Sequence, residues 1–401
     1  MFKNILKSYD YSLLAVFLLI SIFGLVMVYS ASMVMAVANG LESDFFYKKQ
    51  LGNLIIALIG FIITAILPYK ILKNNRILIP IVFVSLIGLF TLFFFGKVAN
   101  NAQSWFDLGA RNIQPGEFVK LCVIVYLSAV YAKKQAYIDH FNQGVVPPLI
   151  YLVLVCILVG VQPDIGTASI IFVIGSIIAV CSGMGLKNLF KLTMIGLLVI
   201  ALFSPLILMK KDTIFTENRI GRINSFIDPF EYEQTEGYQV VNSYIAIGNG
   251  GLTGVGLGKS IQKLGYLPEA HTDFIISIVA EELGVFGVAF VLASLGYIVL
   301  RGFYIGMKCR DPFGSLLAFG ISGMIGIQSF INLGGATGLI PLTGVTLPFV
   351  SYGGSSLLVL SVGIGILLNV SMFTNYERNY KNKIRNQVQE ENRRPNVKWS
   401  Y

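Results

Sequence analysis

Long apolar blocks separated by short polar stretches make up the chain from Tyr11 to Phe373. Each block runs for about 20 residues, the length that an α-helix needs to cross the ~30 Å hydrocarbon layer of a membrane. Backbone polar groups have no water to bind inside that layer, so the blocks are expected to be helical. The pattern predicts about ten transmembrane helices, at residues 11–37, 45–67, 77–96, 114–132, 147–162, 165–184, 189–209, 273–300, 313–335 and 351–373.

Composition supports an all-α polytopic membrane protein. Hydrophobic residues make up 55% of the chain and charged residues 13%, with a mean hydropathy of +0.72, whereas roughly 25% of an average soluble domain is charged. The first block is too long for the core of a signal peptide, so it is predicted to remain as the first span. The four cysteines show no C-x-x-C spacing, which argues against a disulfide framework or a cysteine metal site.

Basic residues predict the orientation. If alternate loops face opposite sides, 19 of the 30 Lys and Arg lie on the side of the N-terminus. Cytoplasmic loops carry the excess of positive charge, so both termini are predicted to be cytoplasmic. This topology also accounts for the net charge of +9 without a nucleic-acid partner.

The predicted spans form a single transmembrane domain, residues 1–373, followed by a basic cytoplasmic tail, residues 374–401. One connection is much longer than the others, a large extracellular loop at residues 210–272 before the eighth span, and long loops are usually functional or disordered. Its aromatic residues and the helix-like string GYQVVNSYIAIG favour order. The glycine-rich string from Gly248 to Gly258 resembles a phosphate-binding loop, but Thr253 stands where that pattern needs glycine, so tight turns are the better interpretation.

Charged residues inside spans are expensive and mark function or a paired structural role. Glu117 and Lys120 are three residues apart, hence on one helical face. A structural ion pair and a polar cavity remain equally open here. Just before this span lie Trp105, expected at the membrane interface, and Arg111, whose guanidinium suits a phosphate at headgroup depth.

Two other polar features lie at span ends. Asp164, in VQPDIGT, is predicted to cap the helix that follows it. The last outer loop carries Pro341 and Pro348 at membrane depth, where irregular backbone is tolerated only against protein or a wet cavity, so it predicts a cavity.

Asp273 is expected in the first turn of the eighth span, where the helix dipole stabilises a carboxylate without any chemical role. A reactive carboxylate at the membrane surface is the alternative, and the local sequence does not separate the two. Continuing the helix, Glu281 lies roughly 80° around and about 12 Å deeper, and Glu282 points to the opposite side. Neither forms a close carboxylate pair with Asp273 in this geometry, so both are predicted to hydrogen-bond within the bundle.

Several strings together resemble one known family. WFDLGARNIQPGEFVKL, QPDIGTA, LPEAHTDFI, EELG and PFVSYGGSS occur in the order found in the SEDS family (shape, elongation, division and sporulation; FtsW, RodA and SpoVE), and the similarity extends from the first span to Phe373. The LPEAHTDFI form looks more like the FtsW branch than the RodA branch. Most members read Q-P-S-E-F where this chain has Gly116 in place of the serine.

The resemblance implies a peptidoglycan glycosyltransferase that polymerises lipid II outside the bacterial cytoplasmic membrane, at the division septum for the FtsW branch. Membrane lipid, a class B penicillin-binding protein and other division proteins are the implied partners. Asp273 falls on the essential aspartate, and Arg111, Glu117 and Lys120 fall on functionally important polar positions. Trp105 and His271 are further candidate substrate-binding residues, and a divalent cation could help to neutralise the leaving pyrophosphate.

Two other classes of function compete with the enzyme. A transporter of the lipid-linked precursor would use Glu117 and Lys120 as its polar path, although the sequence has no evident inverted repeat. A scaffold would only recruit division proteins, and within the family an elongation polymerase of the RodA type is the alternative. Asp273 discriminates among these classes, because a transporter or scaffold has no obvious need for a carboxylate at the outer mouth.

Overall fold

The computed structural model describes residues 2–99, 102–107, 109, 112–194, 221 and 224–381. Within these ranges eight helices are long and apolar enough to cross a membrane, and Ile165–Cys181 is a shorter apolar helix. The α-helices are α1 (Phe2–Leu6), α2 (Tyr11–Ala38), α3 (Phe45–Ile66), α4 (Asn75–Phe95), α5 (Pro115–Lys133), α6 (Val146–Val161), α7 (Ile165–Cys181), α11 (Tyr238–Gly250), α12 (Ile275–Lys308), α13 (Pro312–Ala336) and α14 (Gly354–Tyr376). Short helical turns are η1 (Tyr69–Lys73), η2 (Gln135–Tyr137), η3 (Phe141–Val145), η4 (Gln262–Leu264) and η5 (Glu377–Lys381).

The predicted all-α membrane fold is confirmed. Nine of the ten apolar blocks are helices, and the block at 189–209 lies largely outside the described residues. The main difference is α12, which continues to Lys308 instead of ending at residue 300. Arg301 lies inside it because its guanidinium Nε donates to Asp10 Oδ2 at 2.7 Å, which compensates a charge that otherwise predicts a helix end.

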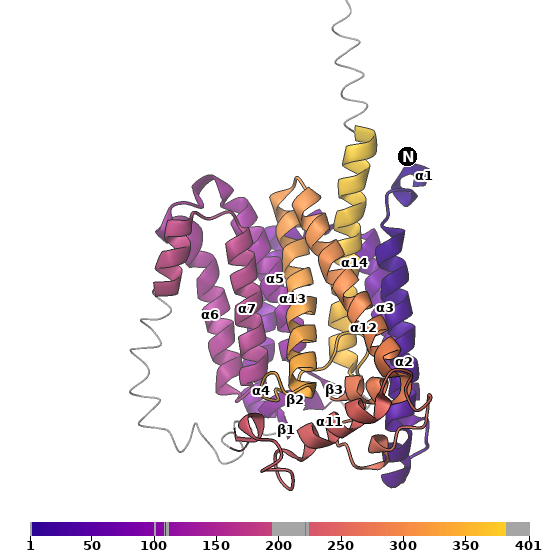
Figure 1. Ribbon diagram of the computed structural model, residues 1–401. Helices are drawn as coiled ribbons and strands as arrows, with labels where there is room; N and C mark the ends of the chain where they lie inside the picture. Colours follow the sequence, from indigo (N-terminus) through magenta and orange to yellow (C-terminus); the bar gives the residue numbers. More distant parts are fainter. Residues whose placement is uncertain are drawn as a thin grey trace, which may run out of the picture.

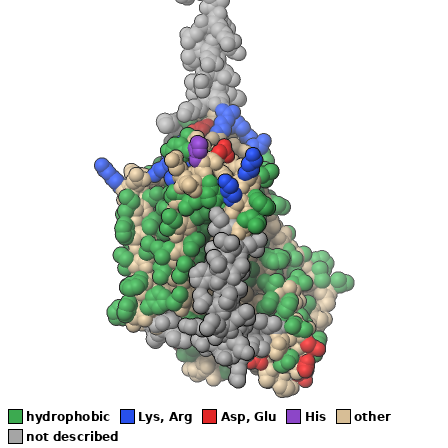
Figure 2. All heavy atoms as spheres, turned by 90° about the vertical axis from the view of Figure 1, so that its left-hand side faces the viewer, with side chains coloured by type: hydrophobic (Ala, Val, Ile, Leu, Met, Phe, Trp, Pro, Cys, Tyr) green, Lys and Arg blue, Asp and Glu red, His purple; other side chains and the backbone are tan. Residues whose placement is uncertain are grey.

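The helices form a bundle in which α13 packs against α5, α7 and α12, and α3 packs against α14. Figure 1 shows α1 and the last turn of α14 at the same end of the bundle, which we call the inner end, and α11 and the strands at the opposite, outer end. On the flank in Figure 2, apolar side chains cover the middle of the bundle and Lys and Arg gather at the inner end. This distribution agrees with the predicted orientation.

A small antiparallel sheet connects α4 to α5 at the outer end, where the sequence indicated only a loop. Its strands are β1 (Lys97–Ala99), β2 (Ala102–Asp107) and β3 (Asn112–Ile113), in the order β1-β2-β3. Phe106 lies opposite Ile113 and Asp107 opposite Asn112. The strands bring the chain back to Pro115, the first residue of α5, where proline is favoured because its missing N–H would be unpaired there anyway.

The glycine-rich string after α11 forms tight turns that lie against α12. A Cβ on Gly254 would lie 2.2 Å from the backbone oxygen of Glu282, and a Cβ on Gly284 would lie 2.4 Å from that of Leu252. Gly284 itself has φ 63° and ψ −155° and kinks α12, a conformation open almost only to glycine. These glycines allow two backbones to touch, and the string has no need of a phosphate to explain it.

Candidate functional site

Asp273 precedes α12 and is not in its first turn. The helix begins at Ile275 with Phe274 as its N-cap residue, and its first turn has no acidic residue. The preceding residues form consecutive turns in which the N–H groups of Thr272 and Phe274 donate to Glu269 O at 3.1 and 3.3 Å, and Glu269 has φ 55°. The expected first-turn position is therefore wrong, and the half-buried Asp273 is presented by a turn at the outer end.

Neighbouring elements hold this turn through its backbone. Asn332 of α13 donates from Nδ2 to Asp273 O at 2.8 Å and to Val345 O at 2.7 Å. Ser351 Oγ donates to Thr272 O, and Tyr352 N donates to His271 O at 2.9 Å. The turn is thus joined to α13 and to the loop between α13 and α14, which fixes the backbone on both sides of the carboxylate.

His271 is buried among aromatic rings beside Asp273. Its ring centroid lies 4.8 Å from Phe46 and 5.5 Å from Tyr352, and only 4% of the residue is exposed. Burial lowers the pKa of His271, and nearby Glu269 opposes that shift without reversing it. Nδ1 has no hydrogen-bond partner among the described residues. His271 is therefore a neutral, packed side chain that supports the turn.

Glu117 and Lys120 form a buried ion pair in α5. Lys120 Nζ donates to Glu117 Oε1 at 2.7 Å, with 1% and 9% of the two side chains exposed. Glu117 Oε2 has no hydrogen-bond partner in the described part of the chain. Buried polar atoms are nearly always paired, so an unmet carboxylate oxygen needs an explanation. Glu117 and Lys120 thus form the ion pair that was one of the two expectations. The Oε2 atom of Glu117 can still accept a hydrogen bond from a water or ligand.

The loop between α13 and α14 links the two groups. Gln114 N, just before α5, donates to Ser355 Oγ, in the first turn of α14 directly after this loop, at 3.1 Å. On α7, a Cβ added to Gly166 would lie 3.2 Å from Thr343 O, while a Cβ on Gly344 would lie 3.6 Å from Asp273 Oδ2. Thr343 and Gly344 thus lie between the start of α7 and the Asp273 carboxylate. The outer ends of α5 and α7 and the Asp273 turn therefore meet around this loop and the start of α14.

The other predicted residues have four different outcomes. Trp105 is half-buried in β2, opposite Lys97. Asp164 caps α7 as predicted, since its Oδ1 accepts from Thr167 N at 3.0 Å, and its Oδ2 also accepts from Ser104 Oγ at 3.3 Å. Arg111 lies outside the described residues. Pro341 borders a small hollow between the last outer loop and α11, lined by Phe226, Val240, Tyr244 and Leu342 among others.

Glu281 and Glu282 are completely buried and bind the segment before the Asp273 turn. Glu281 accepts from Ser260 Oγ and from the N–H of Ile261 at 3.1 Å. Glu282 pairs with Lys263 Nζ at 2.6 Å and accepts from Ser30 Oγ of α2 at 2.7 Å. Both are buried, as predicted, but only Glu282 bonds to another helix of the bundle, through Ser30, whereas Glu281 accepts from the outer segment at residues 260–262. Sequence reasoning missed Ser30, Ser260, Lys263 and Asn332, although polar residues in or beside apolar blocks were the available signal.

The described residues contain no group of three or more His, Cys, Asp and Glu side chains that could hold a metal ion. Such clusters are the usual protein ligands of transition metals.

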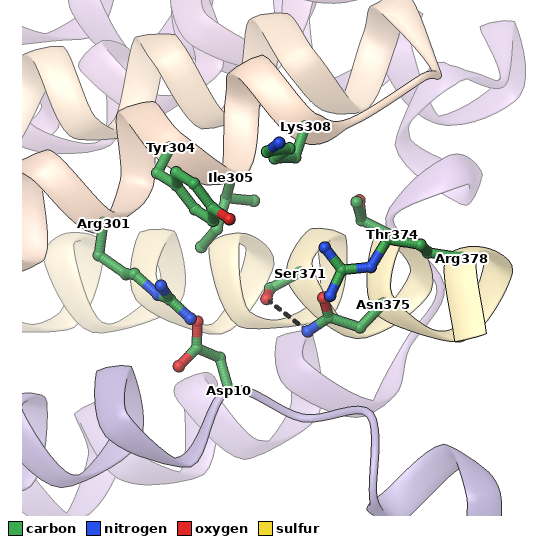
Figure 3. Close-up of a pocket in the computed structure, with 9 residues that line it drawn as sticks. All are labelled: Asp10, Arg301, Tyr304, Ile305, Lys308, Ser371, Thr374, Asn375 and Arg378. Atoms are coloured by element: carbon green, nitrogen blue, oxygen red, sulfur yellow. Dashed lines mark hydrogen bonds and ion pairs between the residues drawn. The ribbon is translucent and has the colours of Figure 1, made fainter.

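A pocket of about 80 Å³ lies at the inner end, away from the Asp273 turn, between the start of α2 and the ends of α12 and α14. Figure 3 shows Arg301 reaching toward Asp10 while Lys308 and Arg378 line the other side. Burial raises the pKa of Asp10, and hydrogen bonds from Arg301, Ser12 and Leu13 outweigh it, so the pKa lies below its ordinary value. The pair joins α2 to α12 at the inner end.

Known proteins match nearly the whole chain. "Probable peptidoglycan glycosyltransferase FtsW" of Bacillus subtilis is 56% identical over 384 residues, covering 96% of this chain and 95% of that protein. "Stage V sporulation protein E" of the same organism is 38% identical, covering 92% and 98%. Among solved structures, a chain described under "Structural coordination of polymerization and crosslinking by a peptidoglycan synthase complex" has a TM-score of 0.71 at 26% identity and covers 91% of this chain and 98% of its own.

A second solved structure, the rod shape determining protein RodA of Thermus thermophilus, has a TM-score of 0.64 at 26% identity and covers 90% of this chain and 96% of its own. The family model described as "Cell cycle protein" (FtsW/RodA/SpoVE) matches residues 10–376. The chain therefore belongs to the FtsW/RodA/SpoVE family of cell cycle proteins, the SEDS family predicted from its motifs, and is most like FtsW.

Proposed function

We propose that this protein is a peptidoglycan glycosyltransferase that polymerises lipid II into glycan strands at the outer face of the bacterial cytoplasmic membrane. Family membership and the likeness to a probable peptidoglycan glycosyltransferase support the reaction class. The observation that carries the assignment of the site is Asp273. A half-buried carboxylate stands at the outer end, on a turn held from α13 and from the last outer loop.

The chemistry needs an acceptor, a base and a stabilised leaving group. The 4-hydroxyl of one sugar attacks the anomeric carbon of a sugar linked to lipid diphosphate, and the bond to the diphosphate oxygen breaks with inversion. Asp273 orients the acceptor hydroxyl and takes its proton. Lys120, held by Glu117, supplies positive charge toward the departing diphosphate. Arg111 would share that task at headgroup depth.

The remaining candidates act at the edge of the site. His271 packs between Phe46 and Tyr352, so its contribution is to hold the Asp273 turn more than to contact the sugar. Trp105, on β2, offers an indole face at the entry from the membrane surface. Lipid tails would enter laterally, since the reactive turn directly precedes the membrane-spanning helix α12.

Partners and location follow from the same reading. A related solved chain belongs to a synthase complex that coordinates polymerisation and crosslinking, which supports a class B penicillin-binding protein as the crosslinking partner here. The likeness to FtsW supports a place at the division septum with other division proteins. Residues 1–373 would act as one catalytic membrane domain, and α14 with η5 extends to Lys381, into the predicted tail.

The test uses purified full-length protein with labelled lipid II, and glycan polymer is resolved on a gel. Asp273→Asn and Asp273→Ala are expected to lose polymerisation while keeping the wild-type unfolding temperature. Glu42→Gln, which changes an exposed outer carboxylate, is the matched control and is expected to retain activity. Normal polymerisation by both Asp273 variants would show that the assignment is wrong.

A precursor transporter remains the second candidate because Glu117 and Lys120 form a buried pair with an unmet oxygen, as a polar path requires. Lipid II movement in proteoliposomes separates the two functions. Movement that needs Glu117 and Lys120 but not Asp273 would favour transport, whereas polymer formation that needs all three favours the enzyme.

A further inference from the structure

A second buried ion pair, Lys263–Glu282, lies at the outer end of α12 and has no role in the proposed mechanism. Lys263 Nζ contacts Glu282 Oε1 at 2.6 Å and Ser30 Oγ at 2.9 Å, and Ser30 Oγ contacts both carboxylate oxygens of Glu282 at 2.7 Å. The side chains of Lys263 and Glu282 are 1% and 0% exposed. Three elements therefore meet at one point: α2, the segment before the Asp273 turn, and α12.

Glu281, the residue before Glu282 on α12, binds the same segment at residues 260–262. Its carboxylate accepts from Ser260 Oγ and from the N–H groups of Ile261 and Gln262 at 3.1 and 3.3 Å. Backbone bonds run alongside, from Val255 N to Glu281 O at 2.9 Å and from Gly256 N to Glu282 O at 3.0 Å. We call Ser30, Ser260, Lys263, Glu281 and Glu282 the outer clamp.

The outer clamp closes a loop in the chain. Lys263 lies ten residues before Asp273 and Glu282 lies nine residues after it, so the carboxylate stands near the middle of the enclosed segment, residues 264–281. Asn332 and Ser351 then fix the tip of that segment. The base and the tip are thus held by different elements.

We infer that the outer clamp positions Asp273 for the reaction. A buried ion pair seldom stabilises a fold more than apolar residues of the same size would, so stability alone gives a weak reason for two carboxylates and a lysine here. A fully bonded polar network does fix one register between the segments that it joins. That register matters for chemistry, because a displacement of about 1 Å can cost on the order of 100-fold in rate.

This inference rests on the proposed function, and Lys263, Glu281 and Glu282 are positioning residues that do not touch substrate. Sliding the 260–263 segment along α12 would shift the start of the enclosed segment and hence the direction of the Asp273 carboxylate. In the proposed mechanism the leaving group is held around α5 and Asp273 only orients and deprotonates the acceptor hydroxyl, so most of the substrate is bound away from the clamp. Loss of the clamp should therefore lower kcat and leave KM nearly unchanged.

The test compares two double variants of the full chain in detergent or nanodiscs, with lipid II as substrate. Lys263→Met/Glu282→Gln removes the outer pair, and Asp10→Asn/Arg301→Met removes a pair at the inner end of the same helix. The outer variant is expected to lose 10- to 100-fold in kcat with KM within threefold of wild type. The inner variant is expected to keep kcat within twofold of wild type, even if its unfolding temperature falls by as much as that of the outer variant. Lys263→Arg, which retains the charge, is expected to keep at least a third of wild-type kcat.

A kcat within twofold of wild type in the outer variant would overturn the inference, as would an equal loss in the inner variant at the same unfolding temperature. If the outer variant does not fold, Ser30→Ala decides, since it removes the α2 hydroxyl and leaves the charges paired. A three- to tenfold loss of kcat supports the clamp, and unchanged kcat contradicts it. Asp273→Asn is assayed in parallel: activity there refutes the proposed function, whereas an inactive Asp273→Asn beside a fully active outer variant refutes the clamp alone.

Discussion

Two buried Lys–Glu pairs of almost equal length differ in how completely their atoms are bonded. Lys120–Glu117 measures 2.7 Å and Lys263–Glu282 measures 2.6 Å. Ser30 and Ser260 add donors to Glu282, whereas Glu117 Oε2 has no partner among the described residues. The first pair belongs to one helix, whereas the second joins α12 to the segment before the Asp273 turn, 19 residues away, and reaches α2 through Ser30.

The difference indicates different roles. A fully satisfied buried network holds its segments in one arrangement. An incompletely satisfied pair carries the cost of burial without the compensating bonds, and such a group is explained most simply by a ligand or water that completes it. We therefore assign Lys263–Glu282 a positioning role and Lys120–Glu117 a place in the substrate site.

The largest effect on the fully bonded pair, Lys263–Glu282, is expected from Gly284→Ala. The new Cβ would lie 2.4 Å from Leu252 O, at φ 63°, so strain and overpacking together should cost about 2–6 kcal/mol. Unfolding by denaturant measures this loss in the free energy of unfolding. Gly296→Ala, on the same helix with open space around it, is the control and should be neutral or slightly stabilising. Equal effects of the two changes would mean that the close approach of the backbones does not support the outer clamp.

The double variant Glu117→Gln/Lys120→Met tests the incompletely bonded pair, Lys120–Glu117. Losing the charge that faces the leaving group should lower polymerisation about 100- to 1,000-fold, while the unfolding temperature stays the same or rises, because the buried charges and the unmet oxygen are removed together. Glu42→Gln/Lys48→Met removes an exposed pair of the same 2.7 Å length and should change neither quantity. A large drop in stability with normal polymerisation would reverse our assignment of the two pairs.

His271 adds a third buried polar group, and its pKa gives the comparison a pH dependence. Burial lowers the pKa of His271 in the folded protein, whereas the unfolded side chain titrates near 6.5. As pH falls below about 6.5 the unfolded state binds the proton first, so stability decreases on acidification. His271→Asn should flatten the curve of unfolding temperature against pH between about 6.5 and 5. The exposed His140, changed to Asn, should leave the curve unaltered.

The smallest effect is expected beside Glu117. In Gly116→Ser the added Cβ would lie 3.1 Å from Thr167 Cγ2, a mild overlap that should cost about 1 kcal/mol of stability. Adding Thr167→Ser removes that methyl group and should restore the unfolding temperature. If the double variant is no more stable than Gly116→Ser, crowding against α7 is not the cause, and the loss lies in the first turn of α5.

Hydropathy predicted the spans well because length and apolar content are what a bilayer demands of each helix separately. It ended the eighth span at residue 300, since a charge next to a span usually marks its end, and the compensating Asp10 lies 291 residues away in the chain. The start of α12 was misplaced for a related reason. Asp273 has the chemistry of a first-turn residue, but the bonds to Glu269 keep the backbone in turns up to Phe274.

The candidate site was predictable only in part. Asp273 and the α5 residues came from motifs, and periodicity alone left Asp273 divided between a helix end and a reactive group. Helical spacing placed Glu117 and Lys120 on one face, and the structure pairs them. Nothing local pointed to Ser30 as a partner of Glu282, because 252 residues separate them. Contacts across that distance depend on how the bundle closes.

The closed segment between Lys263 and Glu282 has a consequence for variation in the chain. Changing the number of residues in the mostly exposed turns at 227–236, before α11, leaves Asp273 in place as long as α11 and the turns after it still pack on α12 and Ser260 and Lys263 return to Glu281 and Glu282. Doubling such a loop costs only about 0.6 kcal/mol in closure entropy. Insertions and deletions there are insulated from the reaction, so this part of the outer surface is free to diverge with its surroundings, and it is the place to insert an epitope tag without silencing the protein.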